Sequence, residues 1–503
     1  MAEGQRRAAG LAACCTVLLL AGCSGKEHGS GAEGAQAERF RVTIAAAQVG
    51  EALADGNIVE QEMEAYTGTR LEIQWIPSTA YDDKVSVMIA SGKLPMMLRL
   101  KSTSESVRAI QSGLFWEIGP YLKSYGNLSE LSPQYYDNIR VDGKLYGIPL
   151  FRDMARSAVV YRKDWLDKLG LEPPASIEDW YELCRAMAQG DPDGNGLNDT
   201  YGLILGKKYN DGSAAITTRI AVSLGAPNKW GVNEQGQFTP EFMTEPYRDV
   251  LRLLRRLYAE RLVNRDFAVL DDDEAEKQYD TGRGGLRVGV AQNAKGMQDR
   301  LAASGIKGEY DLAPMTGPSG IRATAEPGNN GFYVFPKSSV AAEEDLKKVL
   351  GFIDRMLDEE MATLQLRGVE GRHFVRIEGG SAIYKDFDLF QKEVKPYRDT
   401  FFNLEGYKGL PLKDTPLGEK GKRIPKESLA AAVRNPASGL QSKTYTERGK
   451  ELEERIGDAQ TKFIMGKIDE AGWQAEVDAW LQAGGGQMIR EYEEAYAKTS
   501  QAR

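Results

Sequence analysis

One short loop carries the residue types best suited to binding a metal ion. Its oxygen donors stand at every second position and comprise the side chains of Asp191, Asp193, Asn195 and Asp199 and the backbone carbonyl of Leu197. Calcium binds about six or seven oxygen atoms, and a tight loop delivers them because alternate side chains converge on one point. Gly196 stands at the sixth position, where the chain has to turn sharply. The spacing therefore predicts a structural Ca²⁺ site in this loop.

Two features of the same loop leave other interpretations open. Position twelve is Gly202, whereas a regulatory calcium loop has a bidentate Glu there. A further ligand would then come from Thr200, from elsewhere in the chain or from water. Pro, Gly, Asn and Asp also form plain turns without any ion. If an ion binds, we expect a fixed structural ion rather than a calcium sensor.

The chain offers little material for other catalytic or metal sites. It has two histidines, His28 and His373, so neither a His-based triad nor a His-rich metal site is expected. The nucleophile motif Gly-x-Ser-x-Gly does not occur in the sequence. The 73 acidic residues do include candidate pairs for a two-carboxylate glycoside hydrolase, because sequence spacing does not reveal their separation in space. We expect no enzymatic activity, and an exported carbohydrate-active enzyme is the alternative.

The balance of charge argues against a nucleic-acid partner. Lys and Arg number 64 against 73 Asp and Glu, which gives a formal net charge of −9. Proteins that bind nucleic acid non-specifically neutralise phosphates with an excess of Lys and Arg. We therefore expect no nucleic-acid binding.

The N-terminus has the layout of a secretory signal. Arg6 and Arg7 precede an apolar run from Leu11 to Leu20, which is too short to span a bilayer. Small residues then lead to Cys23, and this end resembles the bacterial lipobox, whose cysteine is acylated and becomes the mature N-terminus. The sequence predicts a signal peptide over residues 1–22 and a lipid, such as palmitate, on Cys23. An ordinary signal with a cysteine at its cleavage site is the alternative.

Residues 23–38 are mostly Gly, Ala, Ser, Glu and Lys, a composition typical of a flexible tether. Cys14 and Cys15 lie in the signal, so Cys184 is the one cysteine left in the mature chain besides Cys23. No internal disulfide is expected. Cys184 is expected to be a small buried hydrophobe rather than a nucleophile.

Alternating strand and helix patterns follow the tether. They predict strands near 40–44, 71–75, 97–100, 145–150, 158–161 and 332–335, and helices near 58–66, 81–90 and 177–189. Ser176 would begin the last of these helices, and Ser339 would cap a later one with a single apolar face. This rhythm is typical of an α/β fold with a parallel sheet, followed here by a helix-rich C-terminal third. A chain of 503 residues exceeds the roughly 250 to 300 residues of a single core, so two lobes are expected.

The order of several segments resembles the extracellular solute-binding lipoproteins of bacterial carbohydrate importers, especially long members related to alginate-oligosaccharide binders. The matching pieces are the lipobox, YDDKVSVMIASGKLP at 81–95, DGKLYGIP at 142–149, VYRKDWLDKLGL at 160–171 and the calcium-type loop that ends at Gly202. The resemblance covers essentially the whole mature chain. One departure is Met96, where such proteins often carry an acidic residue.

The resemblance implies a two-lobe, periplasmic-binding-protein-like (type II) α/β fold with three hinge crossings. Lobe one would comprise residues 39–148 and 314–370, and lobe two residues 149–313 and 371–503. A carbohydrate, expected to be an oligosaccharide, would stabilise a closed shape that the permease subunits of an ABC transporter recognise. The protein would be a monomer, held by its lipid anchor on the extracellular side of the cell membrane. A sensory or adhesion lipoprotein of the same fold is a further alternative.

Candidate ligand contacts follow from the residue types that bind sugars and from their expected places beside the cleft. They are Tyr81, Arg152, Asp153, Trp230, Asn293, Asn329, Asn330 and Arg372. The aromatic residues would stack on sugar rings and the polar residues would bond hydroxyl groups. Each also has a structural alternative, namely packing or internal hydrogen bonding. Whether Arg152 and Arg372 read acidic sugars such as uronates stays open at this point.

Overall fold

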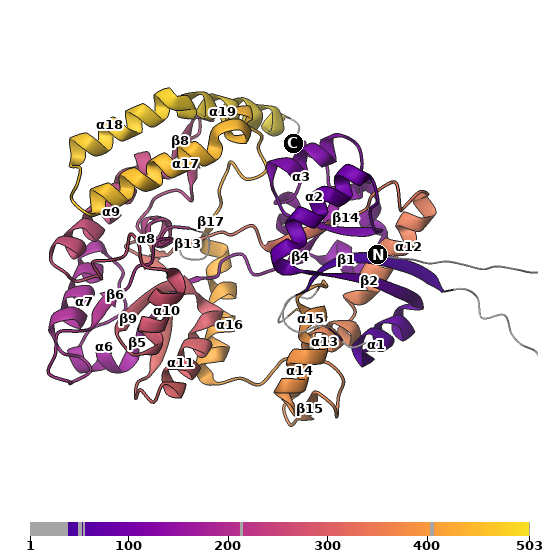
Figure 1. The fold of residues 1–503 in the computed structure, drawn as a ribbon, viewed down its shortest axis with the longest axis horizontal. Coiled ribbons are helices and arrows are strands. Elements are labelled where there is room, and N and C mark those ends of the chain that lie inside the picture. The colour runs from indigo at the N-terminus through magenta and orange to yellow at the C-terminus, as the bar shows by residue number, and fades with distance from the viewer. Residues whose placement is uncertain (1–38, 49–52, 54–55, 212–214, 403–406, 502–503) are drawn as a thin grey trace, which may run out of the picture. The chain divides into compact units, whose positions relative to one another are not determined.

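The computed structural model describes residues 39–48, 53, 56–211, 215–402 and 407–501 (Figure 1). The predicted signal peptide, Cys23 and the tether lie outside these residues. Contacts divide the chain into Met1–Arg39 and Phe40–Arg503, and the elements below belong to the second unit.

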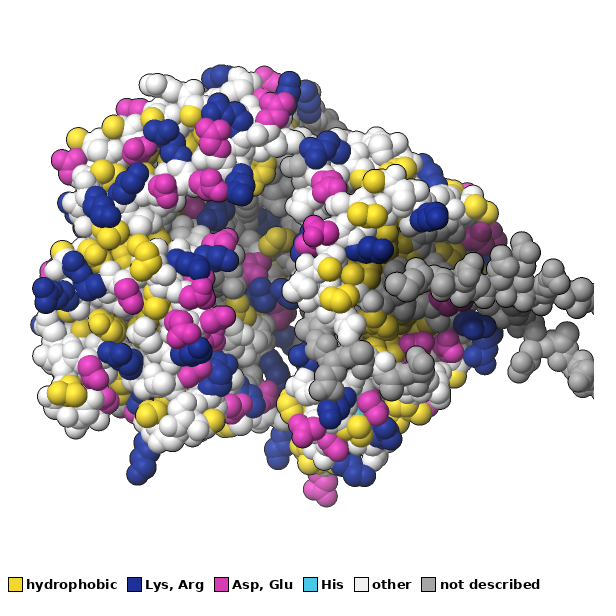
Figure 2. Space-filling model, in the orientation of Figure 1, with side chains coloured by type: hydrophobic (Ala, Val, Ile, Leu, Met, Phe, Trp, Pro, Cys, Tyr) yellow, Lys and Arg dark blue, Asp and Glu magenta, His cyan; other side chains and the backbone are white. Residues whose placement is uncertain are grey.

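The described surface mixes charges of both signs. On the face in Figure 2, Lys and Arg side chains are interspersed with Asp and Glu side chains. Many of them form exposed pairs, such as Lys163 with Asp167, and each such pair contributes about 1 kcal/mol or less to stability. Within the described ranges, no helix combines the length and the apolar composition needed to cross a membrane.

The first sheet has five strands in the order β2-β1-β3-β14-β4. Their bounds are β1 Phe40–Gln48, β2 Thr69–Pro77, β3 Met97–Leu100, β4 Gly147–Phe151 and β14 Asn329–Val334. Strand β1 is parallel to β2 and β3, whereas β14 is antiparallel to β3 and β4. The carboxyl ends of β2, β1, β3 and β4 therefore lie at one edge of this sheet.

The helices between these strands begin and end where the sequence predicts. Asn57 caps α1 (Ile58–Thr67) by accepting a 2.8 Å hydrogen bond from the Val59 amide, and Gly68 ends it in the left-handed conformation. The next two helices are α2 Tyr81–Ser91 and α3 Ser104–Gln111. The predicted strand and helix pattern of the N-terminal part is thus confirmed.

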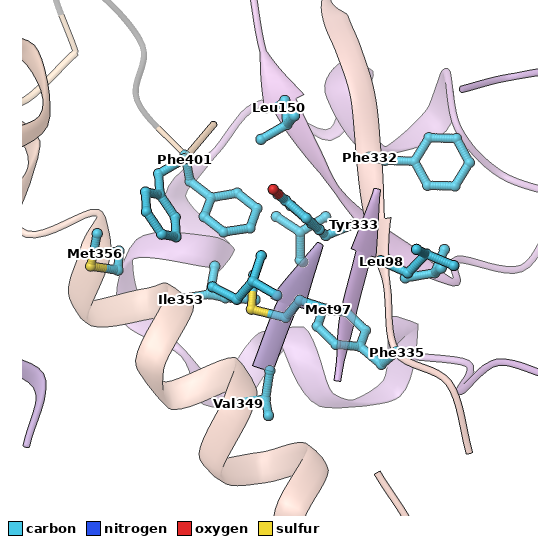
Figure 3. Close-up of a cluster of buried hydrophobic side chains, with 14 of the residues drawn as sticks. Met97, Leu98, Leu150, Phe332, Tyr333, Phe335, Val349, Ile353, Met356 and Phe401 are labelled. Carbon is cyan, nitrogen blue, oxygen red and sulfur yellow. The ribbon is translucent and has the colours of Figure 1, made fainter. Parts of the chain in front are cut away.

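The core of the first sheet lies between its strands and helix α12 (Glu343–Met356). Figure 3 shows Met97 of β3 and Tyr333 of β14 among Val349, Ile353 and Met356 of this helix. All five side chains are almost completely buried, and burying a side chain of this size stabilises the fold by about 1.5 to 3 kcal/mol.

Ser339 does not cap helix α12, contrary to the prediction. The helix begins after Ala342, and the hydroxyl of Ser339 instead donates a 2.9 Å hydrogen bond to the carbonyl of Pro95. The apolar face predicted for the helix is present, because Leu346, Val349 and Ile353 are buried. The other helices around this core are α4 Gly126–Glu130, α5 Pro133–Asp137, α13 Glu359–Arg367, α14 Phe387–Glu393 and α15 Lys395–Arg398.

The second sheet has four strands in the order β10-β5-β9-β6. Their bounds are β5 Ser157–Arg162, β6 Tyr201–Leu203, β9 Gly284–Val290 and β10 Tyr310–Pro314. As predicted, Ser176 begins helix α7 (Ile177–Gln189) and accepts a hydrogen bond from the Asp179 amide. The core of this part includes Trp165, Trp180 and the fully buried Cys184. Its other helices are α6 Lys163–Leu169, α8 Ile216–Ser223, α9 Glu245–Ala259, α10 Asp272–Asp280 and α11 Ala294–Ala303.

Three C-terminal helices complete the second core, as the helix-rich C-terminal prediction requires (Figure 1). They are α17 Lys443–Ile464, α18 Glu470–Trp480 and α19 Gly486–Gln501. Trp473, Val477 and Trp480 lie on one side of α18 and are buried. The short strands of the chain are β7 Trp230–Val232, β8 Phe238–Pro240, β11 Thr316–Gly317, β12 Gly320–Ile321, β13 Ala323–Thr324, β15 Phe374–Ile377, β16 Ser381–Tyr384 and β17 Ala432–Val433.

The chain passes three times between the two cores, but two of the expected lobe boundaries are wrong. The first passage joins β4 to β5, close to the expected residue 148. The second lies between β13 and β14 rather than at 314, because Met315 belongs to the second core. The third lies before α16 (Pro416–Ser428) rather than at 371, because Phe390, Tyr397 and Phe401 pack in the first core and Ile424 of α16 packs on the second sheet.

Candidate functional site

One large cavity has a volume of about 1740 Å³ and is lined by residues from both cores. From the first come residues around helix α5, such as Gln134 and Asn138. From the second come Arg219 of α8, Trp230 of β7 and residues of α19. Residues 322–327 at the second passage and residues 433–441, which follow α16, complete the lining. Both lobes therefore border one large space.

Trp230 is the sequence-predicted aromatic residue that borders this cavity. It begins β7, which pairs with β8, and its side chain is half-buried. Its ring lies 5.1 Å from that of Tyr492 in an edge-on arrangement and 6.5 Å from that of Trp480. The tryptophan therefore both packs on the C-terminal helices and contributes aromatic surface to the cavity wall.

A buried cluster of charges stands beside Trp230, and the sequence analysis did not identify it. Arg219 is only 2% exposed and donates a 3.1 Å hydrogen bond to Glu326. Arg156 donates to the other carboxylate oxygen of Glu326 from Nε at 3.0 Å. Burial lowers the pKa of Arg219 and the carboxylate of Glu326 raises it, so burial has the larger effect. The sequence offered one indication of this cluster, namely that Arg219 stands among mostly apolar residues in α8.

Glu326 and Asn228 tie the chain passages together. Glu326 lies in the second passage and bonds Arg156 of the first. The side-chain amide of Asn228 donates 2.9 Å hydrogen bonds to the carbonyls of Ala325 and Val433. Because these groups join separate segments at the cavity wall, they fix where the backbone bends between the two sheets.

A second cavity, of about 410 Å³, lies at the carboxyl edge of the first sheet. Its wall includes Ala47 of β1, Ser78 after β2, Arg99 of β3 and Phe151 of β4. In open α/β sheets, ligands bind at the carboxyl edge where the strand order reverses, and the order β2-β1-β3 places that point between β1 and β3. Three of the sequence-predicted residues line this cavity: Tyr81, Arg152 and Asn330.

Tyr81 supports the wall of the second cavity through its hydroxyl group. The hydroxyl donates toward the carbonyl oxygens of Ala45 at 3.0 Å and Arg99 at 3.3 Å. Burial raises the pKa of Tyr81, so its hydroxyl stays protonated. The side chain is 3% exposed, which leaves it little surface for stacking on a sugar.

Arg152 occupies the rim of the second cavity, directly after β4. Its amide donates a 2.9 Å hydrogen bond to the carbonyl of Gly328, which joins the first and second passages. Its side chain is exposed, but nearby protein atoms and the positive charge of Arg156 lower the pKa of its guanidinium group.

The remaining four predicted contacts do not line either cavity. Asp153 accepts a 2.8 Å hydrogen bond from Gln292, and Asn329 bonds backbone groups of Pro327 and Gly331. Asn293 is exposed just before helix α11. Arg372 pairs with Glu393 in the first lobe, because the third passage lies well after residue 371. For the two asparagines and for these two charged residues, a ligand contact stays a prediction.

The polar side chains of the predicted calcium loop lie close together, and several of them form hydrogen bonds with one another. The amide of Asn195 donates to Asp193 at 2.9 Å and to Asp199 at 3.1 Å, and the Gly196 amide donates to Asp191 at 3.2 Å. One oxygen of Asp191 is buried without a hydrogen-bond partner, and burial followed by the neighbouring carboxyl groups raises the pKa of Asp193. Leu197 is 59% exposed. Among the described residues, no set of three His, Cys, Asp or Glu side chains has the arrangement of a metal site.

The departure at position twelve of this loop has a steric cause. A Cβ atom on Gly202 would lie 2.4 Å from the Cα and 2.7 Å from the Sγ of Cys184 in helix α7. Strand β6 and helix α7 are therefore too close at this point for any side chain. Burial also raises the pKa of the Cys184 thiol to about 12, which confirms that this residue is a buried hydrophobe.

A family model and two curated relatives match most of the chain. Residues 50–363 match the family "bacterial extracellular solute-binding protein". The chain is 34% identical over 492 residues to lipoprotein LipO of Bacillus subtilis, covering 95% of this chain and 96% of that protein. It is 33% identical over 486 residues to the polygalacturonan/rhamnogalacturonan-binding protein YtcQ of the same organism, with the same coverage of 95% and 96%.

Solved structures share the fold at low sequence identity. An HMO-binding, ABC-transporter-associated solute-binding protein from Bifidobacterium longum infantis superposes with a TM-score of 0.70 at 16% identity, covering 91% of this chain and 98% of that one. An EF-hand mutant of FusA from S. pneumoniae, in complex with fructo-nystose, gives a TM-score of 0.65 at 16% identity, with coverage of 92% and 100%.

These findings confirm the predicted two-lobe α/β fold class with its three passages between lobes. The relatives are solute-binding proteins rather than enzymes, so they do not favour the carbohydrate-active enzyme considered above. The family match covers more than half of the chain, and both B. subtilis relatives match nearly all of it. The chain belongs to the family of bacterial extracellular solute-binding proteins.

Proposed function

We propose that the protein captures an oligosaccharide in the cavity beside Trp230 and delivers it to the permease of an ABC transporter. The observation that carries this proposal is the size and lining of that cavity. Small-molecule pockets measure about 300 to 1,000 Å³, and this one measures about 1740 Å³, which gives room for several sugar units. The relative YtcQ is a polygalacturonan/rhamnogalacturonan-binding protein and FusA has been solved in complex with fructo-nystose, and both support a saccharide ligand.

The wall of the cavity supplies the groups that sugar binding requires. Trp230 offers aromatic surface to the apolar side of a sugar ring. Lys229 offers N–H donors to hydroxyl groups, and the side-chain oxygens of Asn228 and Asn138 offer acceptors, since their amide nitrogens already donate to backbone carbonyls. Because the lining comes from both lobes, a bound saccharide would favour the arrangement in which both contact it, and a permease would recognise that arrangement.

The direct test is calorimetric titration with neutral and acidic oligosaccharides, followed by incubation and product analysis. We expect saturable binding of at least one oligosaccharide with no cleaved product. Cleavage of the saccharide would contradict the binding-protein proposal, and the absence of binding across the panel would contradict the choice of carbohydrate as solute. A monomer is expected on light scattering, with or without ligand.

The site of action is part of the same proposal. The secretory signal and Cys23 would place the protein on the extracellular side of the cell membrane, anchored by an acyl chain. The name of the relative LipO as a lipoprotein supports this placement. Metabolic labelling with a palmitate analogue should mark the wild-type protein and not Cys23→Ala, and the variant should appear in the medium.

We also propose a structural calcium ion in the loop of residues 191–199. The alternate oxygen donors, the unpartnered oxygen of Asp191 and the crowding that raises the pKa of Asp193 all favour a bound cation. The Asn195 amide now donates to Asp193 and Asp199, so binding requires this amide to turn its oxygen inward. Such an ion would fix the loop between α7 and β6 and would take no part in ligand chemistry.

A further inference from the structure

The smaller cavity has a position and a size suited to one unit of a ligand. It lies outside the carboxyl ends of β1, β2, β3 and β4, and its volume is about 410 Å³. Leu150, Phe151 and Phe401 give it some apolar lining. A single sugar ring fits the scale of such a pocket, because typical ligand pockets begin near 300 Å³.

The wall of this cavity is rich in positive charge, although the chain as a whole is acidic. The charged residues that line it are Arg99, Lys101, Arg152, Arg398, Asp82 and Asp399. Lys101 forms an ion pair with Asp82, and Arg398 forms one with Asp399. Both acidic residues of the wall are therefore paired with Lys101 or Arg398. The other two basic residues form no ion pair with an acidic residue of the wall.

Arg99 and Arg152 are those two cations. Among the described residues, no ion pair or side-chain hydrogen bond connects either guanidinium group to another residue, although Arg99 lies 5.6 Å from the ring of Tyr81. The Nε atom of Arg99 is buried and has no hydrogen-bond partner. A buried guanidinium nitrogen without an acceptor loses the water it would otherwise bind, which is unfavourable. Because Nε is itself buried, an anion in the cavity would accept from the other N–H groups of the Arg99 guanidinium, which have no protein acceptor among the described residues.

The two guanidinium groups also lie close enough to act on each other. Burial and the positive charges of Arg156 and Arg99 lower the pKa of Arg152, whereas the carboxylates of Glu326 and Asp399 raise it, and the lowering effects are larger. A carboxylate between them would offset this repulsion and accept hydrogen bonds from both forks. Ser78 and Asn330, which also line the cavity, would be left for the hydroxyl groups of the same ring.

We propose that this cavity binds the carboxylate of a uronate unit of the saccharide, held by Arg99 and Arg152. This proposal rests on the proposed capture of a saccharide and specifies in addition that the saccharide is negatively charged. It makes the protein selective for acidic over neutral sugars, with the selectivity located at the carboxyl edge of the first sheet and not beside Trp230.

The test compares three sugars that differ in charge and one free anion. The full-length folded protein is titrated by calorimetry with a galacturonate trisaccharide, with the same trisaccharide methyl-esterified, with a neutral galactose trisaccharide and with inorganic phosphate. The variants are Arg152→Gln and Arg99→Gln. The matched control is Arg41→Gln, because Arg41 lies at the opposite end of β1, near the amino edge of the same sheet.

We expect the acid trisaccharide to bind the wild type at least about tenfold more tightly than its ester, since a hydrogen bond to a charged group contributes about 1.5 kcal/mol or more. Arg152→Gln should weaken the acid by about tenfold and leave the ester unchanged, Arg152→Lys should recover part of the loss, and Arg41→Gln should change neither. Arg152 is exposed, so its variant is expected to fold even if Arg99→Gln does not.

The outcomes separate this inference from the proposed function. Equal binding of acid, ester and neutral sugar would overturn the uronate site and leave saccharide capture standing. Binding of none of the three would overturn both. Phosphate binding as tight as that of the acid trisaccharide, and equally sensitive to Arg152→Gln, would show a general anion site and overturn the assignment to a uronate.

Discussion

The carboxylate of Glu326 is hydrogen-bonded at 3.1 Å to the almost fully buried guanidinium group of Arg219. One residue lies in a passage between the lobes and the other in helix α8 of the second lobe. This pair, together with Arg156, holds the passages in place beside the large cavity.

The first prediction concerns this pair. Glu326→Gln removes the carboxylate that pairs with the buried guanidinium group of Arg219, so the free energy of unfolding should fall by about 2 kcal/mol. Urea unfolding followed by circular dichroism measures the change. Glu234→Gln is the matched control, because Glu234 is exposed and should alter stability by less than about 0.5 kcal/mol. Equal losses in the two variants would contradict a special role of the Glu326 carboxylate.

The second prediction concerns acid sensitivity at His373. Its Nδ1 accepts a 2.9 Å hydrogen bond from the Val369 amide, so the ring is neutral and its Nε2 donates to Glu393 at 3.0 Å. Burial lowers the pKa of His373, so below the ordinary value of about 6.5 the unfolded chain takes up a proton that the folded chain resists. Stability should therefore fall as the pH drops from about 7.5 to about 5.5.

The hydrogen bond from Arg372 lowers the pKa of Glu393 as well, so its contribution is lost only at lower pH, below about 4.3. Melting temperatures across both ranges test the assignment. His373→Gln should flatten the upper range and leave the lower one. An unchanged slope between about 7.5 and 5.5 in this variant would assign the acid sensitivity to other groups.

The third prediction concerns calcium. Added Ca²⁺ should raise the melting temperature and a chelator should lower it, because an ion that binds only the folded state stabilises it. Asp193→Ala should abolish both effects. Asp458→Ala, an exposed acid on α17, should preserve them. A wild-type protein that melts identically with calcium and with chelator would refute the ion site.

The fourth prediction concerns Trp230. Trp230→Ala should weaken oligosaccharide binding by about tenfold, because it removes aromatic surface from the cavity wall. It should also cost stability, because the ring packs on Tyr492 and Trp480. Phe242→Leu separates the two effects, since Phe242 contacts Trp480 at 5.0 Å and does not line the cavity. If both variants bind as the wild type does, Trp230 is a packing residue only.

Local patterns in the sequence predicted the elements well, because strands and helices depend on neighbouring residues. The alternation in β1, the cap at Ser176 and the glycine after α1 are all of this kind. The predicted helix cap at Ser339 was wrong, because the hydroxyl group donates its hydrogen bond to the carbonyl of Pro95, which is distant in the sequence.

The lobe boundaries and most of the site depend on contacts between distant residues. An apolar run such as Phe401-Phe402 shows that a segment is buried, but not in which of two cores it lies. The cluster of Arg156, Arg219 and Glu326 spans 170 positions, and of the two arginines of the smaller cavity one lies in β3 and the other directly after β4. Residue type identified Arg152, Trp230 and Arg372 alike as candidate ligand contacts. The fold shows that Arg152 and Trp230 line cavities and that Arg372 does not.

The close approach of Gly202 to Cys184 also limits how the loop can change during evolution. A side chain at position 202 would collide with the backbone of α7, so a single substitution to glutamate cannot create the twelfth-position carboxylate of a calcium switch. Replacing Cys184 with a smaller residue would not help, because the nearest clash is with its Cα atom. To become responsive to calcium, this lineage would have to move a whole helix away from its strand.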